Sequence, residues 1–172
     1  MLMDSAAIAE HIPRLRRYAR ALAGDRHRAD DLVQDTLERA LVKFHLWRPG
    51  SDLRAWMFSI MHNVFINQLK ARRELALDEA SEAALESAPQ SDPLAVRDLD
   101  AALRRLPAEQ REVLLLVGLE QLSYAEASQA LGVPIGTVMS RLSRARERLY
   151  VLMSAGADLP DANPATNLKV VK

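Results

Sequence analysis

The stretch Leu122–Leu149 constrains the fold most, because it predicts two helices joined by a tight turn. Ser123 and Glu126 have the spacing of a capping box, in which a hydroxyl and a carboxylate each accept a backbone N–H at a helix start. Gly132 suits the left-handed residue that ends this helix, and Pro134 suits the first turn of the next. The pattern predicts a helix-turn-helix within an all-α domain.

The second helix of this pair has an apolar face and a basic face. Apolar residues recur at steps of four, three and four, at Val138, Leu142, Ala145 and Leu149. The opposite face holds Thr137, Ser140, Arg141, Arg144 and Arg148. In helix-turn-helix docking the N-terminal end of this helix enters the major groove. Thr137, Ser140 and Arg141 are therefore expected at base edges, and the two later arginines at phosphates. The alternative is an ordinary amphipathic helix with a solvated arginine face.

The net charge of zero hides an uneven distribution along the 172 residues. Residues 1–75 hold 13 basic and 9 acidic side chains, a net charge of +4. Residues 76–98 hold 1 basic and 6 acidic side chains, a net of −5, and residues 99–153 hold 7 and 6, a net of +1. Two mildly basic halves joined by an acidic connector are compatible with nucleic-acid binding.

Composition excludes several kinds of site. There is no cysteine, which rules out disulfides and thiolate metal sites and fits a reducing cytoplasm. The histidines lack the spacing of metal ligands, so we expect no metal and no cofactor. No apolar run has the length of a membrane span or a signal peptide, which predicts no membrane insertion. Phosphate-binding glycine motifs are also missing, so nothing indicates nucleotide hydrolysis.

Two helices are predicted near the N-terminus. The first runs from about Pro13 to Gly24, with apolar residues on one face and four arginines on the other. The second runs from about His27 to Lys43, and its inward residues are Ala29, Leu32, Val33, Thr36 and Ala40. Its outward face begins with Asp30, Asp31, Gln34, Asp35 and Glu38. One interpretation of these carboxylates is stabilisation of the helix N-terminus by the macrodipole.

A long helix follows a turn-rich connection and runs from about Leu53 to Arg73. Its apolar stripe is Leu53, Met57, Ile60 and Val64, and Trp56 is interpreted as a core residue. Asn63 and Asn67 share a face, with Lys70 one turn on. Amides followed by cations suit a helix that binds a single nucleic-acid strand.

The remaining segments are a connector, two helices and a tail. Residues 76–98 form an acidic connector, and its alanine-rich part from Leu77 to Ser91 predicts a flexible linker. Helices are expected from near Pro93, and from Pro107 to Gly118 with Val113, Leu114 and Val117 inward. Residues 154–172 lack periodicity and are predicted to be disordered.

Three stretches resemble bacterial sigma factors, and together they cover roughly His11 to Leu149. The run LPAEQREVLLLVGLEQLSYAEASQALGVPIGTVMSRLSRARERL resembles sigma domain 4, and DDLVQDT resembles the segment that docks on the coiled coil of the largest polymerase subunit. The run DLRAWMFSIMHNVFINQLKARR resembles the domain that melts promoters and captures the minus-ten element. With only these two domains, the chain resembles the extracytoplasmic-function group, and ADDLVQ and LPAEQREVLLLV resemble its general-stress branch.

The resemblance implies three sets of site residues. Core polymerase would meet Asp30, Asp31, Gln34 and Asp35. The minus-ten element would meet His45, Arg48, Asn63, Asn67, Lys70, Arg72 and Arg73. The minus-thirty-five element would meet Thr137, Ser140, Arg141, Arg144 and Arg148. The implied domains are residues 1–75 and 99–153. The resemblance also implies that the linker between them passes through the polymerase cleft. The alternative is that the acidic residues of the linker only keep the protein in solution.

The implied protein is a non-enzymatic alternative sigma subunit that directs RNA polymerase to promoters in a stress or envelope response. Its expected partners are core RNA polymerase, through the beta-prime coiled coil and the beta flap, promoter DNA and an anti-sigma factor. Two alternatives stay open. A sigma-like mimic would bind an anti-sigma factor only, although such mimics carry a receiver domain for which this chain has no room. A stand-alone helix-turn-helix regulator would not need the DDLVQD surface or the asparagine-bearing helix.

Overall fold

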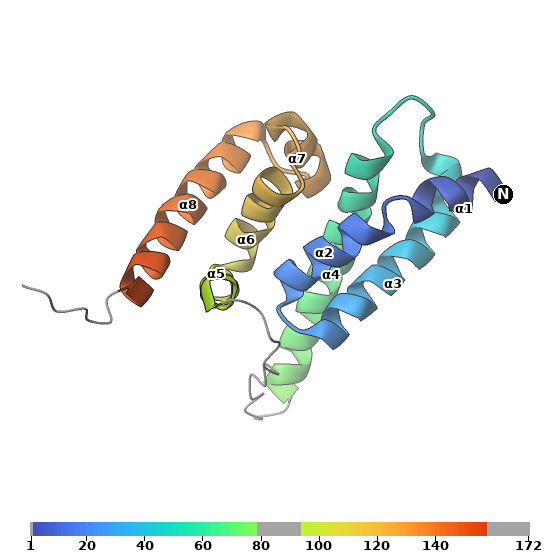
Figure 1. The fold of residues 1–172 in the computed structure, drawn as a ribbon. Helices are drawn as coiled ribbons and strands as arrows, with labels where there is room; N and C mark the ends of the chain where they lie inside the picture. Colours follow the sequence, from blue (N-terminus) through green and yellow to red (C-terminus); the bar gives the residue numbers. More distant parts are fainter. Residues whose placement is uncertain (1, 79–93, 158–172) are drawn as a thin grey trace, which may run out of the picture.

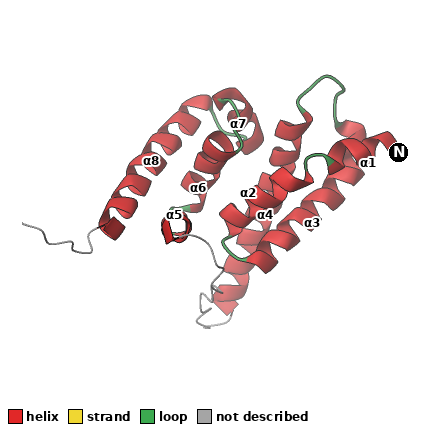
Figure 2. Ribbon diagram, viewed as in Figure 1, coloured by secondary structure: helices red, strands yellow, loops and turns green. Residues whose placement is uncertain are grey.

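The computed structural model describes residues 2–78 and 94–157, and these residues are helical with short connections (Figure 2). The prediction of an all-α fold is confirmed for them. We refer to residues 2–78 as the N-terminal half and to residues 94–157 as the C-terminal half.

The N-terminal half contains α1 (Leu2–Ala9), α2 (Ile12–Ala23), α3 (Arg26–Lys43), the 3₁₀ turn η1 (Phe44–Leu46) and α4 (Leu53–Asp78). Gly24 ends α2 in the left-handed conformation, with φ of 71°. The Asp25 side chain then caps α3 by accepting the N–H of His27. Asp52 does the same for α4, where its Oδ1 accepts the N–H of Arg54 at 2.8 Å.

The face of α3 that packs on α2 and α4 is the one the sequence predicts. The buried residues of α3 are Ala29, Leu32, Val33, Thr36 and Ala40. The Thr36 hydroxyl donates to the Leu32 carbonyl at 2.6 Å, so this polar side chain is satisfied inside the core.

The C-terminal half contains α5 (Leu94–Arg104), α6 (Ala108–Leu114), the π-helical turn η2 (Leu115–Leu119), α7 (Tyr124–Leu131) and α8 (Ile135–Ala157). The predicted capping box is present: Ser123 Oγ accepts the Glu126 N–H, and Glu126 Oε2 accepts the Ser123 N–H. Gly132 ends α7 with φ of 64°, so α7 and α8 form the predicted helix-turn-helix.

Four details differ from the sequence-based predictions. The helix α1 was not predicted, and α4 continues past Arg73. Residues 76–78, assigned to the connector, belong to α4, and residues 154–157, assigned to the tail, belong to α8, whereas the start of α5 at Leu94 agrees with the helix expected from near Pro93. The rest of the predicted linker and tail lies outside the described residues. Finally, η2 buries Leu115 and Leu116, whereas only Val113 of the predicted inward residues is fully buried, because a π turn shifts side chains around the axis.

The two halves pack against each other. Helix α7 lies against α4, and η2 lies against α2. Figure 1 shows α6 and α7 on the side of the C-terminal half that faces α2 and α4. One apolar cluster runs through both, from Tyr18 and Phe58 in the N-terminal half to Val113 and Leu142 in the C-terminal half. The guanidinium of Arg111 in α6 joins them further, because its Nη1 donates to the Leu22 carbonyl at 2.8 Å.

Candidate polymerase and nucleic-acid interfaces

The first candidate surface is the acidic outer face of α3. Asp30, Asp31 and Gln34 are exposed there, and Asp35 is half-buried. Asp35 Oδ2 accepts a hydrogen bond of 2.9 Å from Gln68 Nε2 on α4. The carboxylate of Asp35 is therefore held in place by α4, while Asp30 and Asp31 are exposed and the Asp31 carboxylate lies near the Arg72 guanidinium.

The second candidate surface is a narrow strip along α4. Asn63, Asn67 and Lys70 are exposed and lie one helical turn apart. Arg73 is also exposed, next to this strip. Three of the predicted strand-binding side chains thus share one accessible face.

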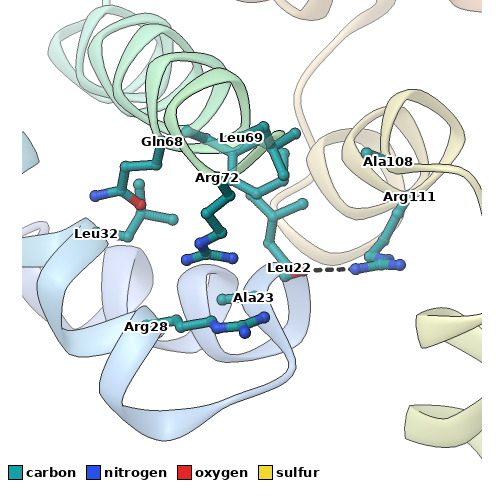
Figure 3. Close-up of a pocket in the computed structure, with 10 residues that line it drawn as sticks. Leu22, Ala23, Arg28, Leu32, Gln68, Leu69, Arg72, Ala108 and Arg111 are labelled. Carbon is teal, nitrogen blue, oxygen red and sulfur yellow. Dashed lines mark hydrogen bonds between the residues drawn. The ribbon is translucent and has the colours of Figure 1, made fainter. Parts of the chain in front are cut away.

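Arg72 lies on the other side of α4. It follows Asn63 by two and a half turns of helix, which places it on the opposite face. Figure 3 shows the Arg72 side chain pointing from α4 toward Arg28 of α3, in a cavity of about 120 Å³ at the junction of the two halves. Burial, together with the positive charge of Arg28, lowers the pKa of Arg72 from its usual value. In this conformation Arg72 is separated from the strip that holds Asn63, Asn67 and Lys70.

The connection before α4 carries the two remaining predicted minus-ten residues. His45 and Arg48 are both exposed. The Nδ1 of His45 lies 2.9 Å from the Val42 carbonyl, and the Ser51 hydroxyl donates to the Arg48 carbonyl at 2.7 Å. The rings of Phe44 and Trp47 in this connection contact each other, with 5.4 Å between their centroids. The loop is therefore ordered by its own contacts, with both basic side chains available on its surface.

The third candidate surface is the basic face of α8. The core face of α8 is as predicted, with Val138, Leu142 and Ala145 buried. On the opposite face the residues Ser140, Arg144 and Arg148 are exposed and Thr137 is half-buried.

Arg141 differs from the other arginines of this face. Its side chain is 24% exposed, and its Nη2 lies 3.4 Å from Glu109 Oε2 of α6. Glu109 is mostly exposed, so this ion pair is weak and a phosphate or a guanine edge can replace it. No local sequence pattern identified Glu109 as the partner of Arg141.

The junction of the two halves contains charged residues that the sequence analysis did not single out. Glu112 and Glu120 are buried, and both face basic side chains of the N-terminal half. Burial and these two carboxylates raise the pKa of Tyr18 well above its usual value. Near them, burial would raise the pKa of Asp52, but the Ala55 N–H and the Arg54 guanidinium outweigh it and bring that pKa below its usual value. Single acidic residues in amphipathic helices look solvent-exposed in a sequence, so no local pattern could have identified them.

Within residues 2–78 and 94–157, no helix has the length and apolarity that crossing a membrane requires. The same residues bring together no group of three or more histidine, aspartate or glutamate side chains suited to a metal ion.

Comparison with known proteins identifies the family. Residues 8–62 match the Sigma2 domain of PhyR, and residues 97–149 match Sigma-70, region 4. The chain is 43% identical, over 83% of its length and 80% of the relative's, to the ECF RNA polymerase sigma factor EcfG of Rhodopseudomonas palustris. This chain belongs to the ECF sigma factors.

Two further comparisons agree with this assignment. The ECF sigma factor SigM of Bacillus subtilis is 31% identical over 83% of this chain and 90% of its own length. Among solved structures, the sigma factor RpoE from Bartonella quintana, in complex with the anti-sigma factor NepR, superposes with a TM-score of 0.78. It is 37% identical, and the match covers 87% of this chain and 96% of that one. As a member of this family, the chain is a transcription initiation factor.

Proposed function

We propose that this ECF sigma factor binds core RNA polymerase through the acidic face of α3 and reads promoters through α4 and α8. The observation that carries the proposal is that three surfaces suited to these tasks lie on three different helices of one chain. An acidic face suits a basic docking site, an amide strip suits unstacked bases, and an arginine face suits duplex DNA.

The chemistry assigned to each surface is binding. The Asn63 and Asn67 amides offer donors and acceptors to bases that leave the stack, while Lys70 neutralises a phosphate. Thr137, Ser140 and Arg141 approach base edges in the major groove, and Arg144 and Arg148 hold the backbone. We infer no catalytic residue, since polymerase itself carries out RNA synthesis, and we place the protein in the cytoplasm, where core polymerase is found.

Control by an anti-sigma factor is part of the same proposal. The Bartonella quintana relative is a sigma factor in complex with the anti-sigma factor NepR. The likeness covers 87% of this chain and 96% of that protein's chain. We therefore propose that an anti-sigma factor of the same kind holds this chain inactive until a stress signal releases it.

A second candidate function is sigma mimicry, because residues 8–62 match the Sigma2 domain of PhyR. A mimic would bind the anti-sigma factor without recruiting polymerase. The exposed arginine face of α8 and the identity of 43% to a named sigma factor favour the first function.

The proposal is tested by co-purification with core polymerase. Asp30 and Asp31 are exposed, and unlike Asp35 their side chains make no hydrogen bond to α4, so Asp30→Arg with Asp31→Arg alters the docking face without breaking a hydrogen bond between α3 and α4. We expect this variant to lose most of its binding to core enzyme with an unchanged circular dichroism spectrum, since surface substitutions cost within about 0.5 kcal/mol.

The matched control is Glu10→Arg with Asp98→Arg, which makes the same change of charge at two other exposed positions. It should bind core enzyme as the wild type does. Equal binding by all three proteins would contradict the assignment of α3, and binding of none of them would favour the mimic.

A further inference from the structure

Polar side chains of α3 and α4 face each other along a hollow whose basic end has no role in the proposed function. Arg28, Asp31 and Asp35 recur at steps of three and four on α3, and Gln68 and Arg72 at a step of four on α4. Such steps place each set in one row along its helix. Arg28 lies near Arg72, and Asp35 is hydrogen-bonded to Gln68, so the rows run in opposite directions. The hollow is therefore basic at one end and holds carboxylates and an amide at the other.

The basic end is a cavity of about 120 Å³ (Figure 3). Arg28 and Arg72 line it from α3 and α4, and Arg111 lines it from α6. A single water needs a cavity of roughly 10–15 Å³, so this one has room for a tetrahedral phosphate. Guanidinium groups gathered around one small cavity repel one another when it is empty, and they suit a phosphate because their N–H groups match its oxygens.

Two of the three guanidinium groups have donors available for a ligand. Arg111 gives its donors to four backbone carbonyls, so it contributes charge alone. Arg28 Nε lies 3.7 Å from Asp25 Oδ2, which is too far for a hydrogen bond. In the described part of the chain Arg72 makes no hydrogen bond, and Asp25 and Asp31 act on it as nearby charges. Arg28 and Arg72 can therefore both donate to one phosphate.

The other end of the hollow is wider and offers acceptors. It measures about 390 Å³, within the range of roughly 300–1,000 Å³ that is usual for small-molecule sites. Gln68 and Arg72 line both this space and the basic cavity, so the two adjoin. Asp35 Oδ2 accepts from Gln68, whereas within the described residues Asp35 Oδ1 and the Asp31 carboxylate accept no hydrogen bond. These oxygens suit a ligand that carries N–H donors.

A nucleotide combines the two chemistries, because it has a phosphate at one end and a base with N–H groups at the other. Arg28 and Asp35 are seven residues apart, which is about 10 Å along the helix at 1.5 Å per residue. Guanine carries a ring N–H beside an amino group, so both oxygens of one carboxylate can accept from it. The other common bases lack this adjacent pair of donors.

We propose that the hollow between α3 and α4 binds a guanine nucleotide, with a phosphate between Arg28 and Arg72 and the base on Asp31 and Asp35. The same two aspartates belong to the face that we assign to core polymerase, so bound nucleotide and polymerase exclude each other. This competition rests on the proposed function, whereas the binding of the nucleotide to the free chain does not.

The test is calorimetric titration of the free full-length chain with guanosine diphosphate, and with uridine diphosphate and inorganic phosphate for comparison. Arg72→Gln removes a phosphate donor, and Asp31→Asn removes the charge of a base acceptor. The matched controls are Arg73→Gln and Asp30→Asn, which make the same changes at adjacent exposed positions, about 100° around each helix. Circular dichroism verifies that each variant is folded.

We expect saturable binding of guanosine diphosphate, with the same Kd for the wild type and both controls. Arg72→Gln and Asp31→Asn should each raise this Kd by about tenfold or more, because each weakens a charge-assisted hydrogen bond. Uridine diphosphate should bind the wild type more weakly, and inorganic phosphate should be sensitive to Arg72→Gln but not to Asp31→Asn. Absence of saturable binding, controls that lose as much as the site variants, or equal affinity for the two diphosphates would overturn the site.

Competition is measured as the apparent Kd of the chain for core polymerase with and without guanosine diphosphate. The nucleotide should raise this Kd for the wild type and leave it unchanged for Arg72→Gln, which excludes an effect of the nucleotide on polymerase itself. An unchanged Kd for the wild type would overturn the competition. Failure of the proposed function is distinguishable, because the chain would then not bind core enzyme even without nucleotide, while the titration of the free chain could still be read.

Discussion

The two helices that we assign to DNA, α4 and α8, differ in how much of their circumference is buried. Helix α8 packs on α5, α6 and α7 through one face, which includes Val138, Leu142 and Ala145, and most of its basic face is exposed. By contrast, α4 packs against α3 on one side and α7 on another, so that Met57, Phe58, Ile60, Met61, Val64 and Phe65 are all buried. Its accessible strip is therefore narrow.

This difference explains why the sequence describes α8 better than α4. A helix with one packed face shows a single apolar stripe, and the remaining surface can be assigned to DNA directly. A helix that is buried on several sides carries apolar residues around most of its circumference, so periodicity no longer separates inside from outside.

The largest expected effect is the loss of stability when a buried side chain of α4 is truncated. Phe58 is 2% exposed and its ring packs edge-on against Tyr18 at 5.0 Å, whereas Tyr150 of α8 is 75% exposed. We expect Phe58→Ala to lower the free energy of unfolding by about 3–5 kcal/mol, because it leaves a cavity in a closed core. Tyr150→Ala should change it by less than about 0.5 kcal/mol. Urea denaturation measures the free energy of unfolding of both variants. Similar losses in the two would contradict the difference in burial between α4 and α8.

A smaller effect is expected on the DNA face of α8, and it separates base reading from backbone binding. Arg141→Ala should cost about 1–3 kcal/mol on a matched duplex and relax the preference within the minus-thirty-five element. Arg148→Ala should weaken binding to all sequences alike and reduce the salt slope by about one contact.

Glu109 provides the control for this prediction, since Glu109→Ala removes the ion pair that competes for Arg141 and should strengthen specific binding slightly. Fluorescence anisotropy on matched and scrambled duplexes at several salt concentrations measures all three variants. A matched-to-scrambled ratio that Arg141→Ala leaves unchanged would show that the base-reading end of α8 is misplaced.

The smallest effect is expected on α4 and tests which of its faces meets the melted strand. Asn67 lies on the exposed strip and Arg72 lies in the cavity near Arg28. Asn67→Ala should reduce open-complex formation by about tenfold or less, because it removes one set of hydrogen bonds to a base, and leave initial duplex binding unchanged. Arg72→Ala, matched by its position on the same helix, should affect open-complex formation less.

Permanganate footprinting of the promoter reports strand opening for both variants. An Arg72→Ala defect as large as that of Asn67→Ala would mean that α4 turns or separates from α3 in the working complex. Equal loss at the binding and melting steps would remove Asn67 from the strand-reading site.

Local signals predicted the parts of the fold that depend on neighbouring residues. The capping box at Ser123, the left-handed Gly132 and the inward set of α3 are all confirmed. Each follows from helix periodicity or end chemistry within a few residues.

The features that the sequence did not predict depend on contacts between distant segments. Glu120 meets Arg17 across 103 positions of the chain, and His62 meets Glu112 across 50. The burial of these charges, and the position of Arg72 between the halves, require knowledge of which helices pack together. Likewise, the π turn at Leu115–Leu119 shifts the inward side chains in a way that a regular helical period cannot show.

Promoter-directed initiation is the central claim, and run-off transcription with core RNA polymerase tests it most directly. Core enzyme is incubated with genomic fragments, with and without this chain, and the starts of the transcripts are mapped. We expect discrete start sites that depend on the chain and share sequence elements near minus ten and minus thirty-five. They should disappear with the Asp30→Arg, Asp31→Arg variant and persist with Glu10→Arg, Asp98→Arg. Transcripts whose starts are the same with and without the chain would contradict the claim.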